Sequence, residues 1–313
     1  MMIGDVQING KVFLAPMCDV TSLPFRLICK RYGAAVVYTE MIFTDAYLFK
    51  NKKTLKRIKI LDEERPVGVQ LVGSSIEKLV ETAKRVEKEI KPDLIDINFG
   101  CPAYNVIKTG SGSAILRDLE LLGKIVNELS YSIKIPLTCK MRILNEESMT
   151  IKAAQIIERS GAKALTVHGR TAKQGYRGKA DWKIIKKIKE KLKIPVILNG
   201  DVVDEDSASR ALKLGVDAIM VGRAAIGNPF IFKRINHFLK TGIKLDEFEV
   251  LQKISTLIEI IQICKEHDYV DITNLKILTN NAVKGYEGSK ELKRIINKSS
   301  SIEQIEKILT TYK

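Results

Sequence analysis

The segment RSGAKALTVHG at residues 159–169 decides how this chain folds. Its glycine ends a helical pattern, because glycine is the usual residue just after the last turn of a helix, and an apolar run follows at once. The same order recurs in RYGAAVVYTE at 31–40 and in KLGVDAIMVGR at 213–223. Repeated helix–strand units of this kind predict parallel strands joined by right-handed crossovers.

Eight apolar runs of this type occupy residues 1–230, with amphipathic helical patterns between them, for example at 77–90 and 118–129. The runs are VFLAPM at 12–17, AVVYTE at 35–40, VGVQLVG at 67–73, LIDINFG at 94–100, IPLTCKMR at 135–142, ALTVHG at 164–169, IPVILNGD at 194–201 and AIMVGR at 218–223. Short β-branched runs are typical of strands buried on both faces of a parallel sheet. Eight of them predict an α/β fold, a (β/α)8 TIM barrel. The alternative, a doubly wound open sheet, usually carries a G-x-G-x-x-G fingerprint after its first strand, and this chain does not.

Beyond residue 245 the pattern changes to helices alone. EFEVLQKISTLIEIIQICKEH at 247–267 has the spacing of a long amphipathic helix, and shorter helical patterns follow near 272–284, 289–297 and 301–311. We therefore expect a barrel domain over 1–240 and a small helical domain over 245–313.

The charge balance points to a polyanionic partner. With 52 basic and 37 acidic residues the chain has a net charge of +15, of which +12 belongs to residues 1–230. A positive field of this size favours nucleic acid, although a lysine-rich composition alone is the plainer interpretation. KNKKTLKRIK at 50–59 has six basic residues and no acidic one. KIIKKIKEKLK at 183–193 has the spacing of a solvated helix face.

Composition excludes several other classes of protein. The chain is 45% hydrophobic and 28% charged, and no apolar stretch approaches the ~18 residues that span a bilayer. The first residues lack the pattern of a secretion signal. Five cysteines without a C-x-x-C pair predict neither a disulfide framework nor a zinc site. We expect a cytoplasmic protein with free thiols and no metal.

Polar residues at the carboxyl ends of barrel strands are candidates for the active site. ILNGD at 197–201 and VGR at 221–223 place Gly200 and Gly222 where backbone N–H groups can approach a phosphate, with Arg223 to pair with it. A plain turn is the alternative role of these glycines. The strand ends carry amides, cations and an imidazole without a carboxylate cluster. That set favours a planar, anionic cofactor over metal-assisted hydrolysis.

Three further residues near strand ends have side chains that could bind a cofactor or transfer a proton. Lys140 and His168 follow adjacent strands, where positive charge would tune a reduced flavin. The alternatives are an ion pair of Lys140 with Asp96 and a hydrogen-bonded core position for His168. Cys101 stands in NFGCP at 98–102, just past the fourth strand. A free thiol is mostly protonated at neutral pH, so Cys101 suits the role of general acid better than that of nucleophile. A buried, inert cysteine is the alternative.

Seven motifs, in order over nearly the whole predicted barrel, resemble the tRNA-dihydrouridine synthase family. They are LAPMCDVTSLPFR at 14–26, VQLVGS at 69–74, IDINFGCPAYNVIKTGSGSAILRD at 95–118, KMR at 140–142, VHGRTAKQGYRGKADW at 167–182, ILNGDV at 197–202 and VGRAAIGNPFIF at 221–232. The elements N-x-G-C-P and HGRT…Q-x-Y-x-G-x-A-D-W are specific to that family. The family often has glycine shortly after K-x-R, whereas this chain reads KMRILNEE at 140–147.

The resemblance implies an enzyme that uses tightly, non-covalently bound FMN and NADPH or NADH to reduce specific tRNA uridines to dihydrouridine. Cys101 would be the proton donor and Asn98 would orient the target uracil, with Lys108, Arg142 and Arg170 near the RNA backbone. The implied cofactor-binding residues are Ala15, Pro16, Met17, Gln70, Lys140, His168, Asn199, Gly200, Asp201, Gly222 and Arg223. The uridine would be flipped out of the folded RNA, because neither flavin nor thiol could reach a stacked base.

Two other functions stay open at this point. A dihydroorotate-dehydrogenase-like FMN barrel acting on a free pyrimidine predicts the same cofactor residues, but gives no use to the net charge of +15 or to the helical appendage. The second is a non-catalytic RNA-binding protein that descends from a barrel enzyme. Such a protein would have lost Cys101 or the flavin ligands, and this chain retains them. We expect a monomer, since no exposed apolar stripe is evident.

Overall fold

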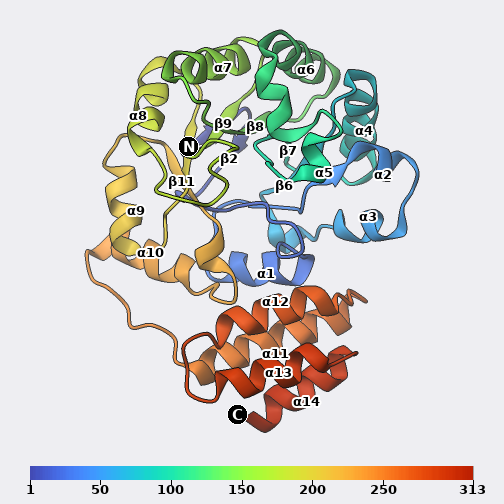
Figure 1. Ribbon diagram of the computed structural model, residues 1–313, viewed down its shortest axis with the longest axis vertical. Helices are drawn as coiled ribbons and strands as arrows, with labels where there is room; N and C mark the ends of the chain where they lie inside the picture. The colour runs from blue at the N-terminus through green and yellow to red at the C-terminus, as the bar shows by residue number, and fades with distance from the viewer. Residues whose placement is uncertain (313) are drawn as a thin grey trace.

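The computed structural model describes residues 1–312 and has the predicted barrel at its centre (Figure 1). Each of the eight predicted runs contains one barrel strand. The strands are β3 (Val12–Leu14), β4 (Val37–Tyr38), β6 (Val67–Val72), β7 (Leu94–Phe99), β8 (Leu137–Arg142), β9 (Ala164–His168), β10 (Val196–Asn199) and β11 (Ala218–Val221). They are parallel and pair in the order β3-β11-β10-β9-β8-β7-β6-β4. Backbone hydrogen bonds from Leu14 N to Val36 O (2.9 Å) and from Ala35 N to Val12 O (2.8 Å) close the barrel.

Helices cover the outside of the barrel. They are α1 (Leu23–Arg31), α2 (Thr44–Leu48), α3 (Lys52–Arg57), α4 (Ile76–Glu89), α5 (Tyr104–Ile107), α6 (Leu119–Ser132), α7 (Glu147–Arg159), α8 (Trp182–Lys191), α9 (Glu205–Leu212) and α10 (Ile231–Thr241). Several start where a side chain accepts hydrogen bonds from the first turn, as Ser75 does for α4, Asp118 for α6 and Asp181 for α8. Such caps stabilise a helix start by about 1 kcal/mol each.

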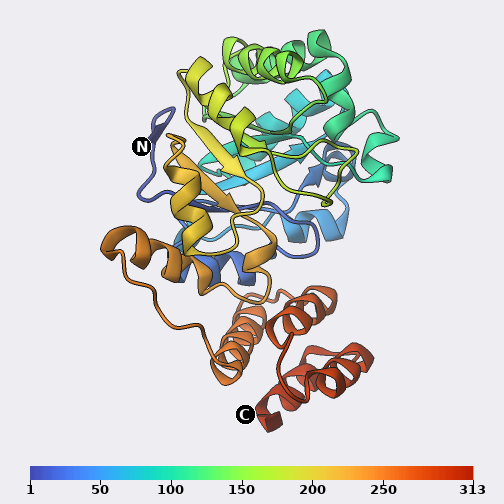
Figure 2. The same ribbon diagram turned by 60° about the vertical axis from the view of Figure 1, so that its left-hand side comes forward.

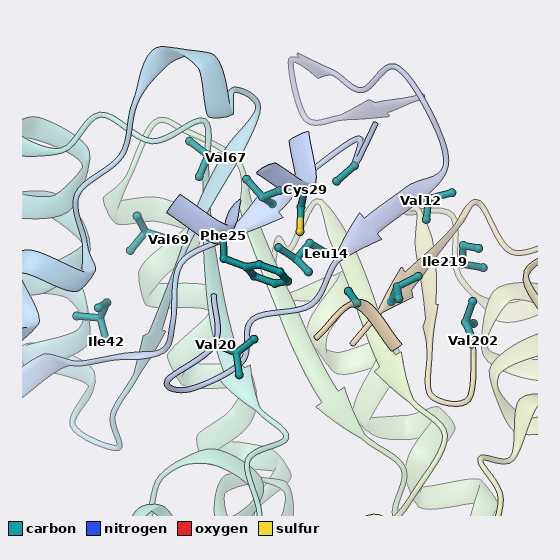
Figure 3. Packing of buried hydrophobic residues seen from close by; sticks show 14 of the residues in the cluster. Val12, Leu14, Val20, Phe25, Cys29, Ile42, Val67, Val69, Val202 and Ile219 are labelled. Carbon is teal, nitrogen blue, oxygen red and sulfur yellow. The ribbon is translucent and has the colours of Figure 1, made fainter. Parts of the chain in front are cut away.

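Strand side chains divide between two hydrophobic layers. Along β7, Ile95, Ile97 and Phe99 join the cluster that packs against the surrounding helices. Figure 3 shows part of the same cluster, where Phe25 of α1 lies against Leu14 of β3. Because side chains alternate along a strand, the residues between them face the barrel interior. The interior of β7 therefore carries polar groups, Asp96 and Asn98, at the end nearest the site.

Residues 250–312 form helices α11 (Val250–Glu266), α12 (Ile272–Ala282), α13 (Ser289–Lys298) and α14 (Ile302–Tyr312), close to the four predicted segments. We call them the helical unit. It lies on one side of the barrel in Figures 1 and 2, and its helix α11 packs on α1. The connecting segment 242–249 is anchored by Phe248, whose ring stacks on Phe230 with 3.6 Å between centroids. This contact attaches the connecting segment to the residue that directly precedes α10.

Several short strands and helices were not predicted from the sequence. β1 (Met2–Ile3) and β2 (Val6–Gln7) form a hairpin whose Ile3 joins the interior cluster, together with the nearby Ile8. The basic run 50–59 forms the exposed helix α3, and β5 (Ile42–Phe43) pairs with β6. Such short elements are set by tertiary contacts rather than by periodicity. Among residues 1–312, no helix combines the length and apolar character needed to cross a membrane.

Candidate active site

A cavity of about 650 Å³ opens at the carboxyl ends of the barrel strands. This volume is in the range of small-molecule and cofactor sites. All of the cofactor residues implied by the resemblance line it, from Ala15 to Arg223, and so do Asn98, Cys101 and Arg142. The structure thus brings together residues that lie more than 200 positions apart in the chain. Lys108 and Arg170 are outside the lining.

A chain of buried amides crosses the cavity floor. Asn98 Nδ2 donates to Gln70 Oε1 (2.8 Å), and Gln70 Nε2 donates to Asp96 Oδ2 (2.7 Å). Thr138 Oγ1 donates to the other oxygen of Asp96 (2.7 Å). Burial raises the pKa of Asp96 to about 6 in spite of these hydrogen bonds. This series of hydrogen bonds fixes the orientation of the Gln70 amide, which could not be predicted from the sequence alone.

The turn that carries Cys101 is fixed from three sides. Asn98 Oδ1 accepts from the backbone N–H groups of Gly100 (3.0 Å) and Cys101 (2.8 Å). The Cys101 carbonyl accepts from the hydroxyl of Ser113 (3.0 Å), and Arg142 Nε donates to Gly100 O (2.9 Å). Cys101 is half-buried and lines the cavity. Its thiol is therefore accessible from the cavity on a backbone that cannot easily move.

Lys140 is a buried cation aimed across the barrel. Its Nζ donates to Asn199 Oδ1 (3.1 Å), and Asn199 Nδ2 in turn donates to Met220 O (2.8 Å). Burial lowers the pKa of Lys140 to about 8, against the attraction of Asp96. The hydrogen bond of Lys140 goes to Asn199, whereas Asp96 accepts from Gln70 and Thr138. Lys140 thus faces the cavity instead of forming a closed ion pair.

His168 lies beside this cation and is neutral. Burial, reinforced by Lys140 and by three arginines, lowers the pKa of His168 to about 2. Its Nε2 lies 3.5 Å from Arg170 Nη1. His168 is therefore a hydrogen-bonding group, and the expectation that it adds positive charge beside Lys140 needs correction. The charge comes from Lys140 and the arginines.

The loops after β10 and β11 form the expected glycine-lined corner. Gly200 has φ of +109°, and a Cβ there would lie 2.8 Å from the His168 ring, so only glycine fits. A Cβ on Gly222 would project toward Ala15 (3.7 Å) and Met17 (3.8 Å), two residues that line the cavity. The Arg223 side chain is about half exposed (52%) at the same corner. One of its nitrogens lies 3.5 Å from Asp201 Oδ1, and the half-exposed guanidinium can still reach an anion in the cavity.

The carboxylate of Asp201, a predicted phosphate-end residue that lines the cavity, bonds to neighbouring groups of the protein. Both of its carboxylate oxygens accept from Arg170 Nη2 (2.7 Å each), and one also accepts from Ala180 N (2.8 Å). These hydrogen bonds hold the pKa of Asp201 below its usual range, although partial burial opposes them. The carboxylate is thus engaged within the protein. Near an anion, Asp201 can offer only its backbone.

The two arginines expected near RNA are buried and hold the loop 171–180. Arg142 Nη1 donates to the carbonyls of Thr171 (3.0 Å) and Gly175 (2.8 Å). Arg170 donates to the carbonyls of Arg177 (3.1 Å) and Gly178 (2.7 Å). Their guanidinium groups bond to backbone carbonyls and, in the case of Arg170, also to Asp201, which is a positioning role. Lys108 is exposed at the end of α5 and stays available to a polyanion.

Tyr176 is a cavity residue to which the sequence analysis gave no role. It is 61% exposed on the loop 171–180, with the guanidinium of Arg223 4.6 Å and that of Arg142 5.7 Å from its ring centroid. Cation–π contacts of this kind hold an exposed ring in place. The motif HGRTAKQGYRGKADW contained Tyr176, but spacing alone could not show that the ring turns toward the cavity mouth.

A second, basic cavity of about 380 Å³ lies between α3 and the start of α12. Lys52, Lys53 and Lys56 line one side, and residues 269–272 line the other. Lys56 Nζ donates to Val270 O (2.5 Å) and lies 4.9 Å from the centre of the Tyr269 ring. The basic run 50–59 therefore contacts the helical unit at the interface between the barrel and the helices.

Among the described residues, one cluster consists of side chains of the kinds that can bind a metal ion. Cys18, Asp19 and Glu40 bring one ligand atom each within 4.8 Å of one another. Arg57 forms ion pairs with both carboxylates, 3.3 Å in the case of Glu40. The guanidinium offsets one of the two negative charges, and burial raises the pKa of Glu40. This cluster is accounted for as a salt-bridge network.

A TIM barrel whose rim offers amides, a buried ammonium group and a glycine–arginine corner has the architecture on which barrel enzymes build their active sites. The chain matches the model of the family described as Dihydrouridine synthase (Dus) over residues 13–312, and it belongs to that family.

Individual relatives agree with this assignment. A probable tRNA-dihydrouridine synthase of Rickettsia bellii is 43% identical over 245 residues, which cover 77% of this chain and 74% of the relative. The tRNA-dihydrouridine synthase B of Xanthomonas axonopodis is 42% identical over 247 residues, with the same coverage. That of Pseudomonas aeruginosa is 38% identical over 262 residues, covering 82% of this chain and 78% of the relative.

Solved structures confirm the fold. Histamine dehydrogenase from Rhizobium sp. 4-9 superposes with a TM-score of 0.59 at 15% identity, covering 84% of this chain. The chain spans half the length of that enzyme. The BexX/CysO complex of Amycolatopsis orientalis gives a TM-score of 0.53 at 16% identity, covering 79% of this chain and 98% of the matched one.

Proposed function

We propose that this chain is a tRNA-dihydrouridine synthase that binds FMN and reduces the carbon 5–carbon 6 double bond of specific tRNA uridines, with NADPH or NADH as reductant. The observation that carries the proposal is the fixed Cys101 turn at the edge of a cofactor-sized cavity. The names of the relatives and the net charge of +15 support tRNA as the substrate. We place the enzyme in the cytoplasm and infer that it acts as a monomer.

The cavity fits FMN. Its volume of about 650 Å³ accommodates a tricyclic ring with a ribityl phosphate, and a side chain at Gly222 would project toward Ala15 and Met17, which line the same cavity. Ala15, Pro16 and Met17 would line the ring, and Gln70, Lys140 and His168 would contact its polar edge. Asn199, Gly200, the Asp201 backbone, Gly222 and Arg223 would hold the phosphate end. When bound, FMN supplies the hydride that adds to carbon 6 of the uracil.

The chain itself supplies the proton and the orientation of the base. Cys101 would donate its thiol proton to carbon 5 of the uracil, which quenches the enolate charge that builds during reduction. One N–H of Asn98 is used by Gln70, and the nearest acceptor for the other is Met41 Sδ at 3.9 Å. A thioether is a weak acceptor, so this N–H is the group that Asn98 can offer to a uracil carbonyl.

We infer a barrel domain over 1–240 that carries the chemistry and a helical domain over 245–313 that helps to bind tRNA. Lys108, at the end of α5, and the exposed lysines of α3 would contact phosphates on either side of the cavity. The buried Arg142 and Arg170 would act indirectly, by fixing the loop 171–180 at the cavity mouth.

The direct test is incubation of the purified protein with NADPH and tRNA that lacks dihydrouridine, followed by mass spectrometry of the tRNA. A gain of two hydrogens at a uridine supports the proposal. Reduction of a free pyrimidine without RNA would instead favour the dihydroorotate-dehydrogenase-like function. Binding of tRNA without any reduction would favour a non-catalytic RNA-binding protein.

Arg223→Ala should weaken FMN binding about tenfold. The variant removes the cationic donor at the glycine corner, and hydrogen bonds to charged groups contribute about 1.5–3 kcal/mol, with the lower end expected for a half-exposed side chain. Flavin fluorescence titration of the apoprotein measures the change. Arg210→Ala on the outer helix α9 is the matched control. Full flavin retention by Arg223→Ala would place the phosphate elsewhere.

FMN affinity should also fall as the pH rises. Lys140 has a pKa of about 8, so it is charged at pH 7 and largely neutral at pH 9, and the anionic cofactor prefers the charged form. The dissociation constant should increase by up to about tenfold between these pH values. Lys140→Met should bind FMN weakly and show no such pH dependence. An unchanged slope in that variant would assign the titration to another group.

A further inference from the structure

The loop 15–22, between β3 and α1, forms one wall of the cavity and is hydrogen-bonded to the helical unit through Asn274 of α12. Asn274 Nδ2 donates to Asp19 O (3.0 Å) and to Val20 O (2.8 Å), and its Oδ1 accepts from Ser22 Oγ (2.9 Å). Asn274 is 2% exposed. Its side-chain amide therefore bonds to this loop, although Asn274 and the loop residues are more than 250 positions apart in the sequence.

The opposite side of the loop is attached to the barrel. Asp19 N donates to Glu40 Oε2 (2.6 Å), and Arg26 Nη1 donates to Thr21 O (2.9 Å). Asp19 has φ of +57°, a backbone conformation that residues with a Cβ rarely adopt. Such a conformation persists only where the surroundings impose it. The shape of the loop thus depends on contacts from both sides, and Asn274 supplies those from the helical unit.

The same helix also reaches a second wall of the cavity. A Cβ on Gly227 would lie 2.5 Å from both Leu278 O and Ala282 N, so the backbone of α12 packs directly against the loop after β11. Ile226, the neighbour of Gly227, lines the cavity, as does Val20 of the loop 15–22. Helix α12 therefore contacts two loops whose side chains form the cavity, on either side of the pairing between β3 and β11.

We propose that Asn274 is a positioning residue through which the helical unit sets the shape of the loop 15–22 and, with it, the affinity of the cavity for FMN. This inference rests on the proposed function for the identity of the ligand. Removal of the Asn274 amide leaves two carbonyls and a hydroxyl without their buried partner, so the loop gains freedom that FMN must then remove on binding. By thermodynamic reciprocity, bound FMN must tighten the docking of α12 by the same factor.

The test compares Asn274→Ala and Asn274→Asp with the wild type. The aspartate variant keeps the size of the side chain and the acceptor for Ser22, but cannot donate to the two loop carbonyls when ionised. We expect FMN to bind about tenfold more weakly in Asn274→Ala and at least as weakly in Asn274→Asp, by fluorescence titration. Asn281→Ala, an exposed asparagine of the same helix, should bind FMN like the wild type.

Hydrogen exchange separates positioning from general destabilisation. In the Asn274 variants exchange should rise in residues 15–22 and stay unchanged in the loop 171–180, which is held by other side chains. Ser22→Ala should give a smaller effect, and adding it to Asn274→Ala should change little more, because both remove the same contact.

Unchanged FMN affinity in both Asn274 variants would overturn the proposal, as would equal acceleration of exchange throughout the chain. If the wild type bound no FMN, the proposed function would fail, and the exchange pattern would still decide whether Asn274 positions the loop.

Discussion

Cys101→Ala should lower dihydrouridine formation by about 10²–10⁴-fold, the usual contribution of a general acid. The variant should keep its FMN and its rate of flavin reduction by NADPH, because Cys101 acts only on the uracil. The Asn98 hydrogen bonds that fix the turn go to backbone N–H groups and survive the substitution. The loss should therefore fall on the step with tRNA and leave the step with the nicotinamide cofactor intact.

The two steps can be measured separately by anaerobic reduction of the flavin and reoxidation with unmodified tRNA. Cys139→Ala, a mid-strand cysteine of β8 that is fully buried, serves as the control and should affect both steps only through packing. Slower flavin reduction with normal tRNA-driven reoxidation in Cys101→Ala would contradict the general-acid role.

Raising the salt concentration from 50 to 200 mM should reduce tRNA affinity by about 10³–10⁵-fold if 6–10 phosphates are contacted. The basis is the net charge of +12 on residues 1–230 and the basic cavity between α3 and α12. A plot of log affinity against log salt should be linear. A flat response would exclude a large phosphate interface.

The same plot identifies the lysines involved. Replacing the exposed Lys50, Lys52 and Lys53 with alanine should reduce the slope by up to about three, one for each lost phosphate contact. Replacing Lys183, Lys186 and Lys191 on the outer helix α8 removes the same charge and should leave the slope nearly unchanged. Equal effects of both triple variants would mean that only the overall charge matters.

The sequence predicted the barrel well because strand periodicity and helix-ending glycines are local signals. It predicted the cavity lining equally well, since the carboxyl ends of parallel strands must converge. It could not predict how individual polar atoms are used. Asp201 has the position of a phosphate ligand, yet its carboxylate binds Arg170, and that pairing depends on the fold of the loop 171–180.

Long-range contacts account for the remaining gaps. The basic run 50–59 was recognised by composition, but its meeting with residues 269–272 brings together segments more than 200 positions apart. The neutrality of His168 follows from burial among cations that reach it from several strands and loops. Neither property has a counterpart in local spacing.

The pairing of β3 with β11 also determines when the active site can exist during synthesis. The first barrel strand leaves the ribosome early, but its partner is complete only at residue 221, and Asn274 follows later still. A nascent chain that ends before residue 221 has the loop 15–22 without the glycine–arginine corner that faces it. A cofactor site that needs both walls would therefore be complete only after residue 223 has been synthesised.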